Sequence, residues 1–332
     1  MALEAVRAAK AAHEGNLLER ENVLGVAVGR KVVGGRETEE ACIVVYVDHK
    51  EPERALRGRD LVPRTLDGVR TDVVATGPLR ALPLLETLAV SHTARVRPAP
   101  GGVSIAHEKV TAGTLGVLAH RTSGEAVILS NNHVLANSNA AEKGDAILQP
   151  GPYDGGRPQD AIARLADFVP VAFNEREPDG LGRLLERALG ALLAPVGLGL
   201  RRLPSGKTNL VDAAIATPLA PDLVAPEILE VGAVAGTAAA ALGTRVKKSG
   251  RTTGLTRGKV TGLEATVEVD YGGKSAVFRG QIVSDILSRG GDSGSLVVDE
   301  GNHAVGLLFA GSETTTILNP IDAVLAALRL RL

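Results

Sequence analysis

The sequence lacks the features that mark disulfide-stabilised, membrane-spanning or nucleic-acid-binding proteins. Its single cysteine, Cys42, excludes an intramolecular disulfide and a thiolate metal cluster. It has no apolar run of the roughly 18 residues that a membrane span needs. The 38 acidic residues balance 37 Lys and Arg, so there is no electrostatic footprint for DNA or RNA. We therefore expect neither nucleic acid nor a membrane as a partner.

Aromatic residues are also scarce, at 2% with no tryptophan, which argues against stacking platforms for single-stranded nucleic acid. The core must then be built from Val, Leu, Ile and Ala. The first residues, MALEAVRAAKAAHEGNLLERENV, are charged throughout and lack the apolar segment of a signal peptide. With the lone cysteine, this indicates a cytoplasmic protein. No metal or cofactor is expected, because the histidines other than His133 show no metal-ligand spacing.

The chain divides into a small α+β unit and a longer stretch of short β runs. Residues 2–19 predict a helix, and VLGVAVGRKVVGG and EACIVVYVDHK predict two strands joined by a Gly-Gly turn. From residue 111 onward, short apolar runs alternate with glycine, as in β-barrels or β-sandwiches. The expected division is an N-terminal unit 1–95, a linker 96–110 and a β domain 111–332, with strand groups 111–220 and 221–318 and a C-terminal helix 319–332.

Two further helices are expected within the β domain. Leucines at i, i+3 and i+4 spacing predict a helix over 181–193, inside an insertion at 171–208. At the C-terminus, Asn319 is the expected N-cap and Pro320 lies in the first turn. The apolar faces of both helices make a homo-oligomer an expectation.

The string SRGGDSGSLVV, residues 288–298, places Ser293 among dense glycines at the head of an apolar strand. Glycine costs backbone entropy, so this density indicates a special conformation. The string alone leaves open whether Ser293 is a nucleophile or part of an ordinary tight turn. The decision depends on whether a histidine and a carboxylate occur elsewhere in a compatible order.

His133 and Asp212 supply that order. His133 directly follows the apolar strand AVILS in SNNHVLAN, and Asp212 heads an apolar strand in NLVDAAIATP. Serine nucleophiles need a histidine base and a carboxylate that fixes its tautomer. The chain order His, Asp, Ser is the one that double β-barrel proteases use. Asp160, in PQDAIARL, is a rival for the carboxylate.

The strings SNNHVLA, VDAAIA and GDSGS, in this order, resemble the trypsin/chymotrypsin-like serine peptidases. The histidine segment is similar to that of the bacterial Deg-type branch. The fuller pattern, with GDAILQPGPYDGG and SGRTTGLTRGKV, looks like the narrow-leaf class of plant proteases and its bacterial relatives. The resemblance covers roughly 111–328, and it implies a mainly β, chymotrypsin-like double β-barrel.

The resemblance implies a role for each residue that matches. His133 would be the general base, Asp212 its orienting carboxylate and Ser293 the nucleophile. The N–H groups of Gly291 and Ser293 would form the oxyanion hole. By analogy, Leu287, Phe309, Ala310 and Gly311 would bind substrate, and Leu287 stands where a trypsin-like preference requires an acid.

The function predicted in this way is a serine endopeptidase acting on protein or peptide substrates, with a preference for uncharged apolar P1 side chains. The rival is a protease-like binding module, or a latent protein whose triad is not assembled. The N-terminal unit would cap, inhibit or orient substrates at the cleft, and the sequence leaves these three roles open.

Overall fold

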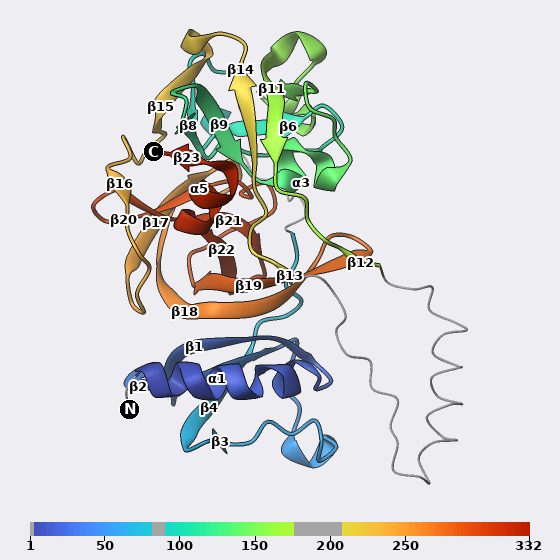
Figure 1. Ribbon diagram of the computed structural model, residues 1–332, viewed down its shortest axis with the longest axis vertical. Helices are drawn as coiled ribbons and strands as arrows, with labels where there is room; N and C mark the ends of the chain where they lie inside the picture. Colours follow the sequence, from blue (N-terminus) through green and yellow to red (C-terminus); the bar gives the residue numbers. More distant parts are fainter. Residues whose placement is uncertain (1–2, 82–89, 176–207) are drawn as a thin grey trace.

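The structure, a computed structural model, describes residues 3–81, 90–175 and 208–332. Three bodies follow one another along its long axis, and Figure 1 shows the N-terminal unit in blue at one end. The orange and red strands lie in the middle, and the green and yellow sheet lies at the other end. The mainly β fold class expected from the sequence is confirmed.

The N-terminal unit is a helix packed on a small sheet. The alternating apolar pattern forms the two expected strands, and Gly34 and Gly35 turn the chain between them with φ of 58° and 78°. Val6 and Leu17 of the helix are buried against Val26 and Ile43 of the sheet. The elements are α1 (Leu3–Leu18), β1 (Val23–Val33), β2 (Arg36–Val47), a 3-10 turn (Glu53–Ala55), β3 (Thr65–Leu66) and β4 (Val69–Ala75).

A sheet near the other end of the molecule forms the first barrel. It contains eight strands in the order β23-β8-β9-β14-β11-β10-β6-β7. Strand β6 and the short strand β5 (Ala99–Gly101) lie within the range 96–110 that was expected to be a linker. The strands are β6 (Ser104–His107), β7 (Gly113–Thr114), β8 (Val117–Arg121), β9 (Ala126–Ser130), β10 (Ala146–Leu148), β11 (Ala161–Phe168), β14 (Ala214–Pro218) and β23 (Leu330–Arg331).

The second barrel closes on itself. Strand pairings run from β17 through β18, β19, β22, β21 and β20 and back to β17. Short strands β12 (Asn174–Glu175) and β13 (Thr208–Asn209) pair with β19, and β16 (Gly236–Thr237) pairs with β21. The barrel strands are β17 (Arg245–Gly250), β18 (Gly254–Asp270), β19 (Lys274–Ser284), β20 (Leu296–Asp299), β21 (His303–Gly311) and β22 (Thr316–Pro320).

The N-terminal sheet is continuous with this second barrel. Strand β1 pairs antiparallel with the later part of β18, with Gly25 opposite Val267 and Gly29 opposite Gly262. A Cβ on Gly25 would come within 2.9 Å of the carbonyl oxygen of Thr266, so glycine permits this close approach. The N-terminal unit is therefore joined to the barrel by main-chain hydrogen bonds.

The remaining described elements are short. They are α2 (Val90–Thr93), β5 (Ala99–Gly101), α3 (Asn132–Leu135), β15 (Val224–Ile228), α5 (Ile321–Leu328) and 3-10 turns at Asn137–Asn139, Pro152–Asp154, Pro158–Asp160 and Pro221–Leu223. The helix expected over 181–193, with most of the 171–208 insertion, lies outside the described residues. In the described ranges, no helix has the length and apolarity needed to cross a membrane.

The C-terminal helix differs from the expectation in two respects. It ends at Leu328, where Arg329 adopts φ of 55°, and the last residues form β23 against β8. Its N-cap is Pro320 rather than Asn319, because the side chain of Asn319 is buried and bonded elsewhere. The helix packs with strands of both barrels in one shared aliphatic core, which includes Leu129, Leu296 and Val324. This core fixes the two barrels against each other.

Candidate active site

His133 lies where β9 ends and the short helix α3 begins. Its Nδ1 atom is 2.7 Å from Oδ2 of Asp212, and its backbone N–H donates to Oδ1 at 3.3 Å. The imidazole keeps 15% of its side-chain surface exposed, whereas the carboxyl group of Asp212 is fully buried. The ring is therefore held by its Nδ1 side.

Asp212 precedes β14 and is held at its backbone as well as its side chain. Its N–H donates to Oδ1 of Asn319 at 2.9 Å, and its carbonyl oxygen accepts from Nδ2 of Asn131 at 2.7 Å. The Tyr271 hydroxyl donates to Oδ2 at 2.7 Å. Burial opposes ionisation of Asp212, but His133 and Tyr271 outweigh it and hold the pKa of the carboxyl below its usual range.

Four of the chain's few aromatic residues gather beside this pair. The ring of Tyr271 contacts His133 edge-on at 5.9 Å between centroids and also contacts Phe173 at 5.2 Å. The rings of Phe278 and Phe309 then pack at 4.7 Å. The ring contacts run from His133 to the strand that carries Phe309, and Tyr271 covers the buried carboxyl group of Asp212 on this side.

Ser293 lies in the loop between β19 and β20. Gly291 and Gly294 adopt φ of 93° and 95°, a region that favours glycine. A Cβ on Gly294 would also overlap Oγ of Ser130 and the carbonyl oxygen of Thr114. Ser293 is 2% exposed, and its Oγ donates to the carbonyl oxygen of Phe309 at 3.4 Å. Among the hydrogen bonds of the described residues, none joins Ser293 to His133.

The carbonyl groups of this loop point into the protein. The carbonyl of Gly290 accepts from the hydroxyl of Thr252 at 2.6 Å, and that of Asp292 accepts from the hydroxyl of Ser295 at 2.6 Å. Both peptide bonds are trans, so the following N–H groups, those of Gly291 and Ser293, point the opposite way. Neither N–H has a hydrogen-bond partner within the described part of the chain.

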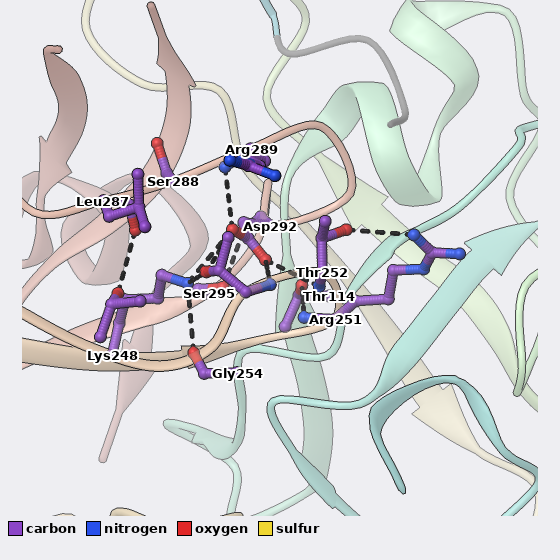
Figure 2. A network of polar contacts seen from close by, with 12 residues as sticks. Thr114, Lys248, Arg251, Thr252, Gly254, Leu287, Ser288, Arg289, Asp292 and Ser295 are labelled. Carbon is purple, nitrogen blue, oxygen red and sulfur yellow. Dashed lines mark hydrogen bonds and ion pairs between the residues drawn. The ribbon is translucent and has the colours of Figure 1, made fainter. Parts of the chain in front are cut away.

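The residue between them, Asp292, anchors the loop through a buried ion pair. Its Oδ2 lies 3.2 Å from Nζ of Lys248, and both side chains are fully buried (Figure 2). Oδ1 accepts from the backbone N–H groups of Thr252 and Thr253, and Oδ2 accepts from Thr253 Oγ1 and the N–H of Arg289. Burial lowers the pKa of Lys248 and Asp292 partly opposes that shift. A charge pair with this many partners fixes the loop geometry.

The residues expected to bind substrate differ in exposure: some line a surface cavity and others are buried. Leu287 is 49% exposed and lines a cavity of about 1060 Å³ with Gly311. Phe309 and Ala310 are fully buried in β21. The cavity walls come from the residues just before Ser293, from 311–314 and from residues 75–78 and 80 of the N-terminal unit.

Asp160, the rival carboxylate, lies elsewhere. Its carboxyl oxygens accept from Nε of Arg95 at 2.9 Å and from the backbone of Arg157 at 3.0 Å. Within the ranges that the structure describes, no cluster of three or more His, Cys, Asp or Glu residues could hold a metal ion.

Five residues that hold this site were missed by sequence reasoning, among them Tyr271, Lys248 and Asn319; the other two are Asn131 and Asp292. Of the first three, only the tyrosine in EVDYGG had a detectable signal, as a rare aromatic residue at a hairpin tip. Lys248 has no distinguishing signal beside its neighbour Lys247, and Asn319 was interpreted as a helix cap.

Comparison with known proteins gives two informative relatives. The chain is 40% identical over 91 residues to Streptogrisin-A of Streptomyces griseus, covering 26% of this chain and 29% of that protein. It is 43% identical over 79 residues to Serine protease 2 of Streptomyces fradiae, covering 24% of this chain and 43% of that protein. The chain thus spans less than half the length of these relatives.

No family model matches the chain. Among solved structures, Thermobifida fusca Protease A aligns with a TM-score of 0.46 at 17% identity, covering 70% of this chain and 98% of that one. The two sequence relatives support the resemblance of this chain to the trypsin/chymotrypsin-like serine proteases.

Proposed function

We propose that the protein is a serine endopeptidase of the trypsin/chymotrypsin-like family. The observation that carries the proposal is the 2.7 Å hydrogen bond between His133 and a buried, ionised Asp212. The positive φ of Gly291 and Gly294 on either side of Ser293 supports it. The His133–Asp212 pair fixes the imidazole with Nδ1 protonated, so Nε2 is left as a base. The similarity to Streptogrisin-A and Serine protease 2 supports the same activity.

In the proposed mechanism, Ser293 Oγ attacks the peptide carbonyl while His133 Nε2 takes its proton. The imidazolium then protonates the leaving amine as the C–N bond breaks, and an acyl-enzyme forms on Ser293. Water hydrolyses this ester with His133 again as the base. In this mechanism, Ser293 Oγ must first leave the carbonyl oxygen of Phe309 and turn towards His133.

The N–H groups of Gly291 and Ser293 are proposed as the oxyanion hole. Their orientation, opposite to the anchored carbonyls of Gly290 and Asp292, supports this role. Each such donor contributes about 3 kcal/mol to transition-state stabilisation. The Lys248–Asp292 pair would keep the hole formed before substrate arrives.

Peptide substrates with an uncharged apolar P1 side chain are proposed, as the exposed leucine at 287 in the cavity wall supports. Phe309, Ala310 and Gly311 would form the strand that pairs with the substrate backbone. The relation to the narrow-leaf and Deg-type branches stays a proposal based on the quoted strings. The cytoplasmic location, the homo-oligomer and the domain boundaries also stay predictions.

The test is labelling with a fluorophosphonate probe, read by peptide mass spectrometry. An adduct on Ser293 that is absent in Ser293→Ala and much slower in Asp212→Asn would establish an activated nucleophile. Absence of an adduct in the folded wild-type chain would contradict the proposal that the protein is a serine endopeptidase. Hydrolysis of peptide libraries would then define the P1 preference.

A latent protease or protease-like binding module is the second candidate. Two observations favour it: Ser293 is 2% exposed, and its Oγ is bonded to Phe309 rather than to His133. A latent enzyme would be labelled only after a partner or a cleavage rearranges the site. Labelling of the isolated wild-type chain excludes this candidate.

A further inference from the structure

A segment of the N-terminal unit pairs with the strand proposed to bind substrate. The N–H of Arg80 donates to the carbonyl oxygen of Gly311 at 3.1 Å, and the N–H of Gly311 donates to the carbonyl oxygen of Arg80 at 2.9 Å. The two residues form an antiparallel bridge. Gly311 has one N–H and one C=O, and Arg80 uses both.

The same segment is held on its other side by the end of β18. The N–H of Ala81 donates to the carbonyl oxygen of Asp270 at 3.1 Å, and the N–H of Asp270 donates to that of Leu79 at 3.1 Å. Arg80 and Asp270 form a parallel bridge. Residues 79–81 therefore lie in a two-sided slot between Gly311 and Asp270, as a strand bonded through its backbone.

Residues 79–81 bind in the slot through main-chain hydrogen bonds. Leu79 is 3% exposed and packs in the core that includes Phe309, whereas the side chain of Arg80 is exposed. Arg80 also lines the cavity that Leu287 and Gly290, just before Ser293, help to form. The slot thus opens beside the loop that carries Ser293. It holds an extended backbone through hydrogen bonds and buries one apolar side chain, that of Leu79.

We propose that this slot is the binding site for an extended peptide, and that residues 79–81 occupy it as a substrate-like strand that a peptide must displace. The proposal rests on the proposed endopeptidase function and adds Asp270 as the second backbone partner. Both occupants need the same N–H and C=O of Gly311, so they exclude each other. An occupant in the same chain competes at an effective concentration on the order of millimolar.

The test compares Arg80→Pro with Arg80→Ala. Proline removes the N–H that bonds Gly311, and alanine keeps it while removing the same side chain. With an extended peptide p-nitroanilide, we expect Arg80→Pro to lower KM by about 2- to 10-fold, as for loss of one hydrogen bond. Arg80→Ala loses the same cavity-lining side chain but keeps the N–H, so the change in KM is measured relative to this variant. Equal KM values in folded Arg80→Pro and Arg80→Ala would overturn the proposal.

Fluorophosphonate labelling separates this inference from the proposed function. If no variant is labelled, the endopeptidase fails, and binding of the fluorescent peptide VATGPLRA, residues 74–81, still tests the slot. We expect it to bind Arg80→Pro more tightly than the wild type, and to lose affinity when the amide nitrogen of its arginine is methylated. Equal binding of the peptide to Arg80→Pro and to the wild type would overturn the proposal that residues 79–81 occupy the slot.

Ala81→Pro is the second variant, used if Arg80→Pro does not fold. It removes the N–H that bonds Asp270 and leaves the bonds to Gly311, so it weakens the segment from the other side. The expected change is a lower KM in the same direction. An unchanged KM in folded Ala81→Pro would contradict the role given to Asp270.

Discussion

The two halves of the candidate site are held by different means. The His133–Asp212 half is assembled: His133 and Tyr271 bond the buried carboxylate of Asp212, and Asn319 of β22 accepts from its backbone N–H. The Ser293 half is held at its backbone by the Lys248–Asp292 pair, while the Ser293 hydroxyl bonds to the carbonyl of Phe309. In the proposed mechanism, the base His133 is therefore preorganised and the nucleophile Ser293 is not, so substrate-dependent steps should act on the serine side.

Removing the charge of Asp212 should have the largest effect. Asp212→Asn keeps the shape of the side chain but stabilises the wrong tautomer of His133, so kcat should fall about 10⁴-fold. Steady-state hydrolysis of a peptide ester and a peptide amide measures it. A loss below tenfold in a correctly folded variant would show that Asp212 does not orient the base.

Breaking the Lys248–Asp292 ion pair should lower the stability of the protein and disturb the loop that carries Ser293. Lys248→Met leaves the carboxylate of Asp292 buried and unpaired, which should lower the free energy of unfolding by about 3–5 kcal/mol. Urea unfolding measures this, with Lys247→Met on the same strand as the matched control. In the double variant with Asp292→Leu, stability should recover in part while labelling of Ser293 does not. Full recovery of labelling would show that the Lys248–Asp292 pair does not position the loop that carries Ser293.

Removing the Tyr271 hydroxyl should weaken the base half by a smaller amount. Tyr271→Phe loses a hydrogen bond to a charged group, about 1.5–3 kcal/mol of unfolding free energy. The pKa of Asp212 is lower in the folded protein than the usual carboxyl pKa of 3.8. The hydrogen bond therefore contributes fully above pH 3.8, and its contribution is lost as the pH falls through the lower pKa of the folded state.

Urea unfolding of Tyr271→Phe and wild type between neutral and acid pH measures this dependence. Tyr153→Phe is the control, since its ring and its contact with Arg251 are kept. A difference between wild type and Tyr271→Phe that stays constant down to strongly acid pH would contradict the link to Asp212.

The smallest effect is expected at the rival carboxylate. Asp160→Asn loses its ion pair with Arg95 at a position remote from His133, so kcat/KM should stay within about twofold of wild type. The same assay as for Asp212→Asn measures it. A loss comparable to that of Asp212→Asn would reverse the choice between the two carboxylates.

The sequence predicted the local features of this site and fold well. The alternation in VLGVAVGRKVV and the glycine pair after it predict β1 and its turn. The strings around His133 and Asp212 name two residues that the structure joins by a hydrogen bond, whereas the place of Ser293 in a triad stays a prediction. These signals are local, because a strand, a turn and a strand end each depend on neighbours within a few positions.

The contacts between distant segments were beyond the sequence. Lys247 and Lys248 are equivalent as letters, and only the packing of β17 decides which is buried against Asp292. The hydroxyl of Tyr271 reaches Asp212 across 59 positions, and Arg80 reaches Gly311 across a still longer separation. Asn319 had a convincing local role as a cap, which the tertiary bond to Asp212 overrode.

The pairing of β1 with β18 has a consequence for the integrity of the protein. Strand β18 bonds β17 along its first part, and its later part, from Gly262 to Val267, bonds β1 on that same side. Loss of the N-terminal unit would leave this stretch as a bare strand edge with unpaired N–H and C=O groups, a template for aggregation. By pairing with this edge, the N-terminal unit protects the second barrel from edge-to-edge aggregation with other chains.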